Sequence, residues 1–147
     1  MKIIIQRVSK SSIYVDEKLF SSINKGLNVL LGISTYDNET HIPYLVNKIL
    51  NMRIFEDANG KMNLSIKDIK GEILLISQFT LYGNCKRGNR PSFTKAMDST
   101  NAKVLYDKFI NQLKNNCNLN IKTGVFGAHM NVQIENDGPV TLIVDTA

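Results

Sequence analysis

The chain has 147 residues, of which 43% are hydrophobic and 21% are charged. These values are ordinary for a folded globular protein, so disorder is not the default expectation, and the length predicts a single domain over residues 1–147. The formal net charge of +5 favours a polyanionic partner such as a nucleic acid. No apolar run approaches the ~18 residues of a membrane-spanning helix, and residues 1–5 are too short for a secretory signal. We therefore expect a cytoplasmic protein that has no membrane partner.

The first half of the chain predicts a start rich in hairpins, followed by a helix. Residues 2–8 and 12–15 are expected to be short strands joined by a serine-rich turn, and residues 27–33 a buried strand. Apolar residues then recur at helical spacing, which predicts an amphipathic helix over residues 40–52 with Thr40 as its cap. The stretch Asp57-Ala58-Asn59-Gly60 is a predicted turn, in which the glycine takes a positive φ.

The second half predicts one strand, one helix and two further strands. A strand is expected from Glu72 to Leu81, and then a helix with Ser99 or Thr100 as its cap that ends at Asn115-Asn116. Residues 129–135 and 141–145 alternate as strands do, with Gly138-Pro139 between them. Taken alone, such an Asp-Gly-Pro stretch indicates a hairpin turn. Strands outnumber helices, so we expect an α/β domain in which the helices cover one side of a sheet.

Two short segments at the edges of apolar runs look like parts of a site. They are Ser77-Gln78-Phe79-Thr80 and Asn136-Asp137-Gly138-Pro139-Val140-Thr141. They offer hydroxyls, a carboxamide and exposed backbone groups, but no histidine, cysteine or pair of carboxylates. This inventory suits a pocket that recognises its substrate mainly with backbone atoms.

Six strings of residues in this order resemble the D-aminoacyl-tRNA deacylase family, and the resemblance covers essentially the whole chain. They are Ile5-Gln6-Arg7-Val8-Ser9, Arg53-Ile54-Phe55-Glu56-Asp57, Gly60-Lys61-Met62-Asn63, Ser77-Gln78-Phe79-Thr80, Gly88-Asn89-Arg90-Pro91-Ser92-Phe93 and Asn136-Asp137-Gly138-Pro139-Val140-Thr141. The resemblance implies a three-layer β/β/α fold with hairpin-linked strands and two main helices. It also implies an ester hydrolase that frees D-amino acids, and glycine mischarged on tRNA-Ala, from tRNA without a metal or an organic cofactor.

The family resemblance further implies a homodimer. In that family the Gly138-Pro139 bond is cis, and the segment is inserted into the pocket of the partner subunit. Two successive carbonyl oxygens then point the same way and suit an α-ammonium donor, so that chirality is read by rigid backbone. Arg7 resembles the arginine that braces this segment, although the residue could also be an ordinary exposed strand residue.

Ser77, Gln78 and Thr80 are the candidate catalytic residues. In a continuous strand Ser77 and Phe79 would point one way, and Gln78 and Thr80 the other. A nucleophilic Thr80 would need a base within hydrogen-bond reach, and no histidine or lysine adjoins it in sequence. We therefore favour attack by water assisted by the vicinal ribose hydroxyl, with an oxyanion site of backbone amides near Gln78. The alternative is a strand with a polar side toward solvent.

Two further groups of residues have a candidate binding role. The resemblance places Phe126 and Met130 around the terminal adenosine, while core packing is the ordinary alternative for both. A loop carries Lys86, Arg87 and Arg90, which either contact the tRNA backbone or are simply solvated. A lone histidine such as His129 is more often a surface residue than a catalytic base.

Two rival functions remain at this point. A non-catalytic RNA-binding module would use the basic loop equally well, but would leave the Gly-Pro segment without a purpose. A metal-dependent hydrolase is disfavoured because the chain has two scattered histidines and two cysteines, Cys85 and Cys117, without C-x-x-C spacing. We expect both cysteines to be free thiols.

Overall fold

One long strand, β1 (Lys2–Val15), organises the sheet in the computed structural model, which describes residues 1–147. Its first half pairs antiparallel with β3 (Gly26–Gly32), its second half with β2 (Lys18–Ile23), and nearly its whole length with β8 (Asn131–Asp145). The remaining elements are β4 (Phe55–Glu56), β5 (Met62–Leu64), β6 (Glu72–Ser77), β7 (Ile121–Thr123), α1 (Ile42–Asn51), α2 (Ser99–Asn115) and the 3-10 helices η1 (Glu39–His41) and η2 (Phe79–Tyr82).

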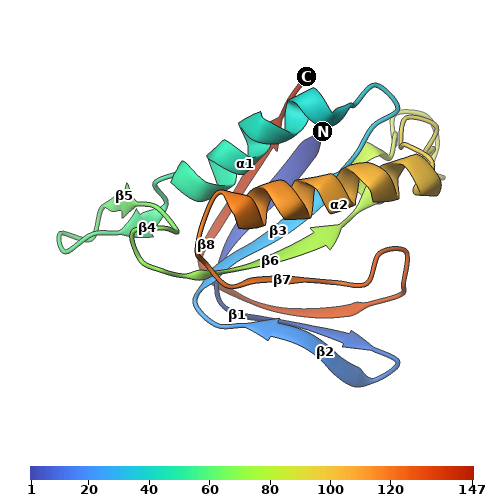
Figure 1. The fold of residues 1–147 in the computed structure, drawn as a ribbon. Coiled ribbons are helices and arrows are strands. Elements are labelled where there is room, and N and C mark those ends of the chain that lie inside the picture. Colours follow the sequence, from blue (N-terminus) through green and yellow to red (C-terminus); the bar gives the residue numbers. More distant parts are fainter.

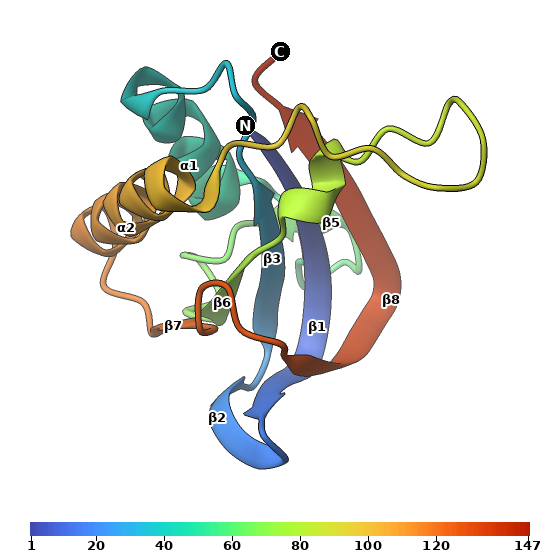
Figure 2. The same cartoon turned by 90° about the vertical axis from the view of Figure 1, so that its right-hand side faces the viewer.

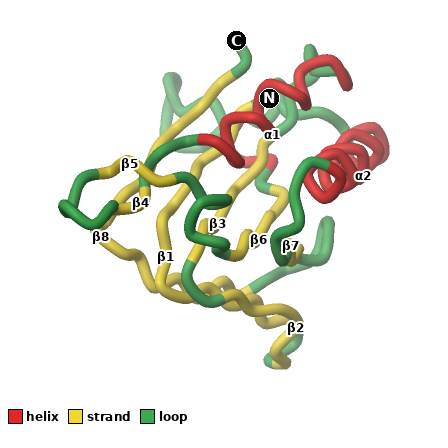
Figure 3. Tube along the Cα trace, turned by 60° about the vertical axis from the view of Figure 1, so that its left-hand side comes forward, coloured by secondary structure: helices red, strands yellow, loops and turns green.

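Six of the strands form one bent sheet. Its order is β2-β1-β3-β6-β7, with β8 along the other side of β1, and the pairs β3–β6 and β6–β7 are parallel. Figure 2 shows β1 and β8 running side by side through the bend. Strands β4 and β5 form a separate small hairpin that stands away from α2 (Figure 3).

Both helices cover the same side of this sheet (Figure 1). Their apolar faces pack into a core cluster of 22 buried residues. Strand β6 is buried on both faces, as expected for a strand between parallel neighbours. Ile73 and Leu75 belong to the helix-side core, whereas Leu74 and Ile76 belong to a second cluster with Val8. The predicted α/β class with two main helices is therefore confirmed, and the strand layers are connected through the bend of β1.

The predicted serine-rich turn near residue 10 is wrong, because β1 runs unbroken from Lys2 to Val15. The serine side chains find partners within the sheet: the Ser11 hydroxyl donates to Asn28 Oδ1 at 3.0 Å, and Ser12 Oγ lies 2.9 Å from Ser22 Oγ. Satisfied hydroxyls let the strand continue. The chain reverses later, at Asp16-Glu17, where both residues have positive φ as in the tight turns of hairpins.

Both helices exist where periodicity predicts them, but their predicted caps are wrong. The helix α1 begins at Ile42 after the short η1, and the side chain of Asn38 accepts from Thr40 N at the start of η1. The helix α2 is capped by Asp98, whose Oδ1 accepts from Asn101 N at 3.0 Å. Hydrogen bonds from the backbone of Asn101 lower the pKa of Asp98. Neither helix is long and apolar enough to cross a membrane.

The predicted hairpin turn at Gly138-Pro139 is also wrong. These residues lie within β8, which continues on both sides of them along β1. Gln6 pairs with Thr141 and Val8 with Asn136, so residues 137–140 all stand opposite the single residue Arg7. The segment is therefore a bulge, in which extra residues on one strand are pushed out of the ladder.

Candidate active site

The predicted strand from Glu72 to Leu81 ends early, at Ser77, and η2 follows it. The amide of Gln78 donates to the carbonyl of Leu31 at 2.8 Å, and the chain then turns. The alternation expected for Ser77 to Thr80 does not apply past the strand end. Instead, Gln78 Nε2 donates to Thr80 Oγ1 at 2.5 Å.

Because the chain turns here, the backbone amides without a hydrogen-bond partner differ from those of a continuous strand. The amide of Gln78 is engaged by Leu31, so it is not available to a ligand. Phe79 and Thr80 open η2, and amides in the first turn of a helix have no acceptor within the helix. The available donors are therefore the amides of Phe79 and Thr80, immediately after the residue that the sequence indicated.

A cavity of about 500 Å³ opens beside this turn, where β6, the start of α2 and the segment before β8 meet. It brings together four of the predicted site residues, Ser77, Gln78, Phe126 and Met130. Its full lining is Ile33, Ile76, Ser77, Gln78, Phe79, Met97, Ser99, Ala102, Phe126, Gly127, Ala128, His129, Met130 and Val132. Such a mainly apolar cavity with a few polar groups suits a small organic ligand.

Phe126 and Met130 are held in the cavity wall by their neighbours. The ring of Phe126 lies 5.4 Å from that of Tyr106, whose hydroxyl donates to the carbonyl of Leu75 at 3.1 Å. Burial raises the pKa of Tyr106, so its phenol stays protonated and keeps this bond. The sulfur of Met130 sits against Gly124, where a Cβ atom would be only 2.6 Å away.

Arg7, Gly138 and Pro139 form a second group, outside this cavity. Arg7 is 5% exposed, and its Nη1 donates to the carbonyl of Ile54 at 2.8 Å. Its Nε donates to the carbonyl of Asp137 at 3.1 Å and lies 3.4 Å from the Asp137 carboxylate. Gly138 and Pro139 are exposed and joined by a cis peptide bond. The buried guanidinium thus ties the bulge to the body of the domain.

Lys86, Arg87 and Arg90 form a third group on an exposed loop. None of the three takes part in an ion pair. The loop is closed at its base by Asn84 and Ser92, which exchange two backbone hydrogen bonds of 2.7 and 3.0 Å. Its cations are therefore available to a polyanion.

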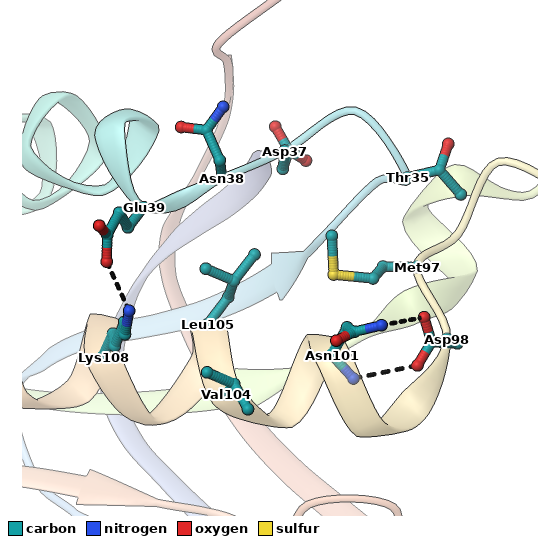
Figure 4. Close-up of a pocket in the computed structure, with 10 residues that line it drawn as sticks. All are labelled: Thr35, Asp37, Asn38, Glu39, Met97, Asp98, Asn101, Val104, Leu105 and Lys108. Atoms are coloured by element: carbon teal, nitrogen blue, oxygen red, sulfur yellow. Dashed lines mark hydrogen bonds and ion pairs between the residues drawn. The ribbon is translucent and has the colours of Figure 1, made fainter.

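A second cavity, of about 540 Å³, lies between η1 and α2 and contains none of the predicted site residues (Figure 4). Most of its charged groups are already paired, since Lys108 binds Glu39 and Asp98 caps α2. Partial burial opposes ionisation of Asp37, but hydrogen bonds from the N-terminal ammonium and Ser34 outweigh it and lower the pKa of Asp37. This cavity is a weaker candidate because its polar groups satisfy one another.

Several lining residues have no counterpart among the sequence predictions. Ser99 and Ala102 come from the start of α2, which periodicity identifies only as a packing helix, and Met97 lies just before it. Phe79 enters the cavity because the strand ends before it. Only the small side chains at positions 99 and 102, on a helix otherwise lined with large apolar residues, could have indicated a cavity there.

Two solved structures have the same fold as this chain. A solved structure described as "Structural Analysis of a probable eukaryotic D-amino acid tRNA deacylase" matches with a TM-score of 0.83, covering 97% of both chains at 16% identity. At that identity the likeness concerns the fold alone. A second solved structure, "c-Myc DNA Unwinding Element Binding Protein", has a TM-score of 0.95 and 43% identity and covers 100% of this chain and 99% of the other.

Sequence comparison then gives the family. A protein of Clostridium perfringens (strain SM101 / Type A) named D-aminoacyl-tRNA deacylase is 53% identical over 146 residues, which are 99% of this chain and 97% of the relative. The family model described as D-Tyr-tRNA(Tyr) deacylase matches residues 4–145. The chain belongs to this deacylase family, and the resemblance drawn from its six strings is confirmed.

Proposed function

We propose that this protein hydrolyses the ester bond between a D-amino acid and the 3′ end of tRNA. The observation that carries the proposal is the junction after β6, where Phe79 lines the cavity and the amides of Phe79 and Thr80 open a helix. An ester carbonyl bound there would meet two donors fixed in place before the reaction. Such preorganised amides stabilise the negative charge that develops on an oxyanion.

The attacking group in this proposal is water. Its oxygen adds to the ester carbonyl, the C–O bond to the ribose breaks, and the ribose oxygen takes a proton, which leaves free D-amino acid and intact tRNA. The vicinal ribose hydroxyl assists the attack. In this proposal Thr80 is a hydrogen-bond acceptor for Gln78 Nε2 and not the nucleophile, because no base lies next to it in sequence. Ser77 and Gln78 orient the substrate at the cavity edge.

Chirality, in this account, is read by the Gly138-Pro139 segment of a second copy of the chain. Both residues are exposed and lie outside the cavity of their own chain. Strand β8 pairs only with β1, so its other edge carries free backbone groups, as the edge of a symmetric dimer would. Two backbone carbonyls would bind the α-ammonium group and leave no room for the side chain of an L-amino acid.

Glycine has no side chain to reject, so glycyl-tRNA would also be a substrate.

The remaining site residues are assigned to the tRNA. Phe126 and Met130 offer an aromatic and a thioether wall for the terminal adenosine, and Lys86, Arg87 and Arg90 contact the phosphate backbone. A tRNA substrate would place the enzyme in the cytoplasm, where Cys85 and Cys117, which form no disulfide here, would stay reduced.

Single-turnover hydrolysis of matched D-, L- and glycyl esters on one tRNA, in the presence of EDTA, tests the proposal. We expect rapid hydrolysis of the D-ester and the glycyl ester, and an L-ester rate near that of buffer alone. Loss of activity in EDTA would identify a metal-dependent hydrolase instead.

A second candidate function is nucleic-acid binding without catalysis, favoured by the solved structure named as a DNA unwinding element binding protein. Under that alternative the protein would bind uncharged tRNA and duplex DNA but leave the D-ester intact. The same assay, supplemented by binding to a duplex, therefore separates the two functions.

A further inference from the structure

Two exposed aromatic rings stand beside the cavity. Phe79, on η2, lines the cavity and is 55% exposed, and Phe93 is 37% exposed. Their ring centroids lie 5.2 Å apart at an interplanar angle of 71°, an edge-to-face arrangement that is favourable for aromatic pairs. We refer to Phe79 and Phe93 as the aromatic shelf. The shelf is apolar surface left in water next to a candidate active site.

The shelf is fixed by the backbone beneath it. The ring of Phe93 lies against Gly83, where a Cβ atom would be 2.9 Å from its Cε1 atom. The paired backbone bonds of Asn84 and Ser92 hold the residue that precedes Phe93. A ligand would therefore meet rings that are already in place, and little conformational entropy would be lost on binding.

Free cations follow the shelf along the chain. The loop between Asn84 and Ser92 projects from the domain beyond η2 (Figure 2) and carries Lys86, Arg87 and Arg90, none of them in an ion pair. One wall of the cavity (residues 76–79), the aromatic shelf and the cations thus follow one another along the chain between residues 76 and 93. Exposed aromatics combined with a positively charged track are the features with which proteins bind single-stranded nucleic acid.

We propose that the aromatic shelf stacks the base next to the terminal adenosine, the last cytosine of the CCA end of tRNA. The proposal rests on the proposed function, in which the cavity holds the adenosine and its ester. Phe79 borders the cavity, so a strand that leaves it passes first over the shelf and then reaches the cations of the loop. Three unpaired cations beside the shelf favour a polyanion over a second copy of this basic chain.

The test compares two substrates that differ only in the nucleotides before the adenosine. We would measure kcat/KM for the D-aminoacyl ester of adenosine and for that of the trinucleotide CCA, with wild type, Phe93→Leu and Phe93→Tyr. Phe93 is outside the cavity lining, and leucine keeps an apolar contact with Gly83. Phe20→Leu is the matched control, because Phe20 is also an exposed phenylalanine (52%) but lies on β2.

We expect Phe93→Leu to lower the preference for the trinucleotide by about tenfold, which is ~1.4 kcal/mol and within the range for one stacked base. The adenosine ester should react as in wild type, Phe93→Tyr should restore the preference, and Phe20→Leu should leave it unchanged. Affinity for an uncharged, 5′-fluorescent CCA oligonucleotide should fall in parallel.

Three results would overturn the inference. They are an unchanged preference in Phe93→Leu, an equal loss on both esters, or a change in oligomeric mass, which would make the shelf a contact between copies. The oligonucleotide measurement keeps the two proposals apart. If wild type hydrolyses no ester but Phe93→Leu still weakens oligonucleotide binding, the proposed activity is wrong and the shelf assignment stands.

Discussion

The guanidinium of Arg7 binds the backbone carbonyl of Asp137, which lies 130 residues later in the chain, with an Nε to oxygen distance of 3.1 Å. The same side chain donates through Nη1 to the carbonyl of Ile54 at 2.8 Å. One buried arginine therefore connects the bulge of β8 to the segment between α1 and β4. A cation in that position fixes the bulge before any substrate arrives.

Replacing Arg7 by methionine should destabilise the protein and reduce deacylation together. The change leaves the buried carbonyl of Ile54 without its partner and frees the bulge, and we expect a loss of about 2–3 kcal/mol in the free energy of unfolding. Arg53→Met is the matched control, because Arg53 Nε also donates to a backbone carbonyl, that of Asn63 at 2.9 Å, but on the surface. The control should cost no more than ~0.5 kcal/mol. Equal urea midpoints for the two variants would contradict the bracing role of Arg7.

Gly138→Ala should abolish activity with only a modest loss of stability. Gly138 has a φ of 128°, and a Cβ atom there would be 2.9 Å from Val140 N and 3.2 Å from Arg7 Nη2. Strain of this kind costs about 1–3 kcal/mol, and we expect the displaced bulge to slow hydrolysis at least ~100-fold, as loss of transition-state contacts does. Gly60→Ala separates the two causes, since Gly60 also has a positive φ (73°) but open space around it. An active Gly138→Ala enzyme would mean that the bulge takes no part in catalysis.

The proposed oxyanion donor can be removed with proline. Phe79 is the first residue of η2, a position that tolerates proline, and Gln78 before it lies outside the helical region, with φ −141° and ψ 81°. Phe79→Pro deletes the amide hydrogen and the ring, whereas Phe79→Leu deletes only the ring. We expect Phe79→Pro to be slower than Phe79→Leu by about 10²–10³ in single-turnover hydrolysis of D-aminoacyl-adenosine. Equal rates would show that this amide does not bind the oxyanion.

Thr80→Ala should keep most of the activity, within about tenfold or ~1.4 kcal/mol of barrier. The variant loses only the contact between Thr80 Oγ1 and Gln78 Nε2 and keeps the backbone amide of residue 80. Thr80→Ser, which retains the hydroxyl, serves as the control. A covalent D-aminoacyl adduct on Thr80, or a loss beyond ~1000-fold in a folded Thr80→Ala protein, would establish a nucleophilic threonine instead.

The sequence predicts those helices and strands that can be identified from the apolar spacing within a single segment. The apolar spacing of α1 and α2 and the continuous run of β6 are enough to identify a helix or a strand. Whether β1 breaks at its serines depends on Asn28 and Ser22, partners that are 17 and 10 residues away. Local pattern contains no information about such partners, so the predicted turn fails there.

In the candidate site, too, the features that depend on distant partners were not predicted. Ser77, Gln78, Phe126 and Met130 meet at one cavity, as their predicted roles require, although those roles stay predictions. The end of β6 depends on the bond from Gln78 N to Leu31, and the bulge at Gly138 depends on the register of β8 against β1. Both features are pairings between distant strands, and they decide which amides and carbonyls are free for a ligand.

The most direct test of the central claim, that two copies build each site, is subunit complementation. Phe79→Pro damages the cavity and leaves the bulge intact, and Gly138→Ala does the reverse. Co-expressed with different tags, the two inactive variants should form mixed dimers in which one of the two sites has both parts intact. Random pairing makes half of the dimers mixed, so the preparation should recover about a quarter of the wild-type D-ester hydrolysis. A preparation that contains mixed dimers but stays as inactive as either variant alone would contradict the shared site.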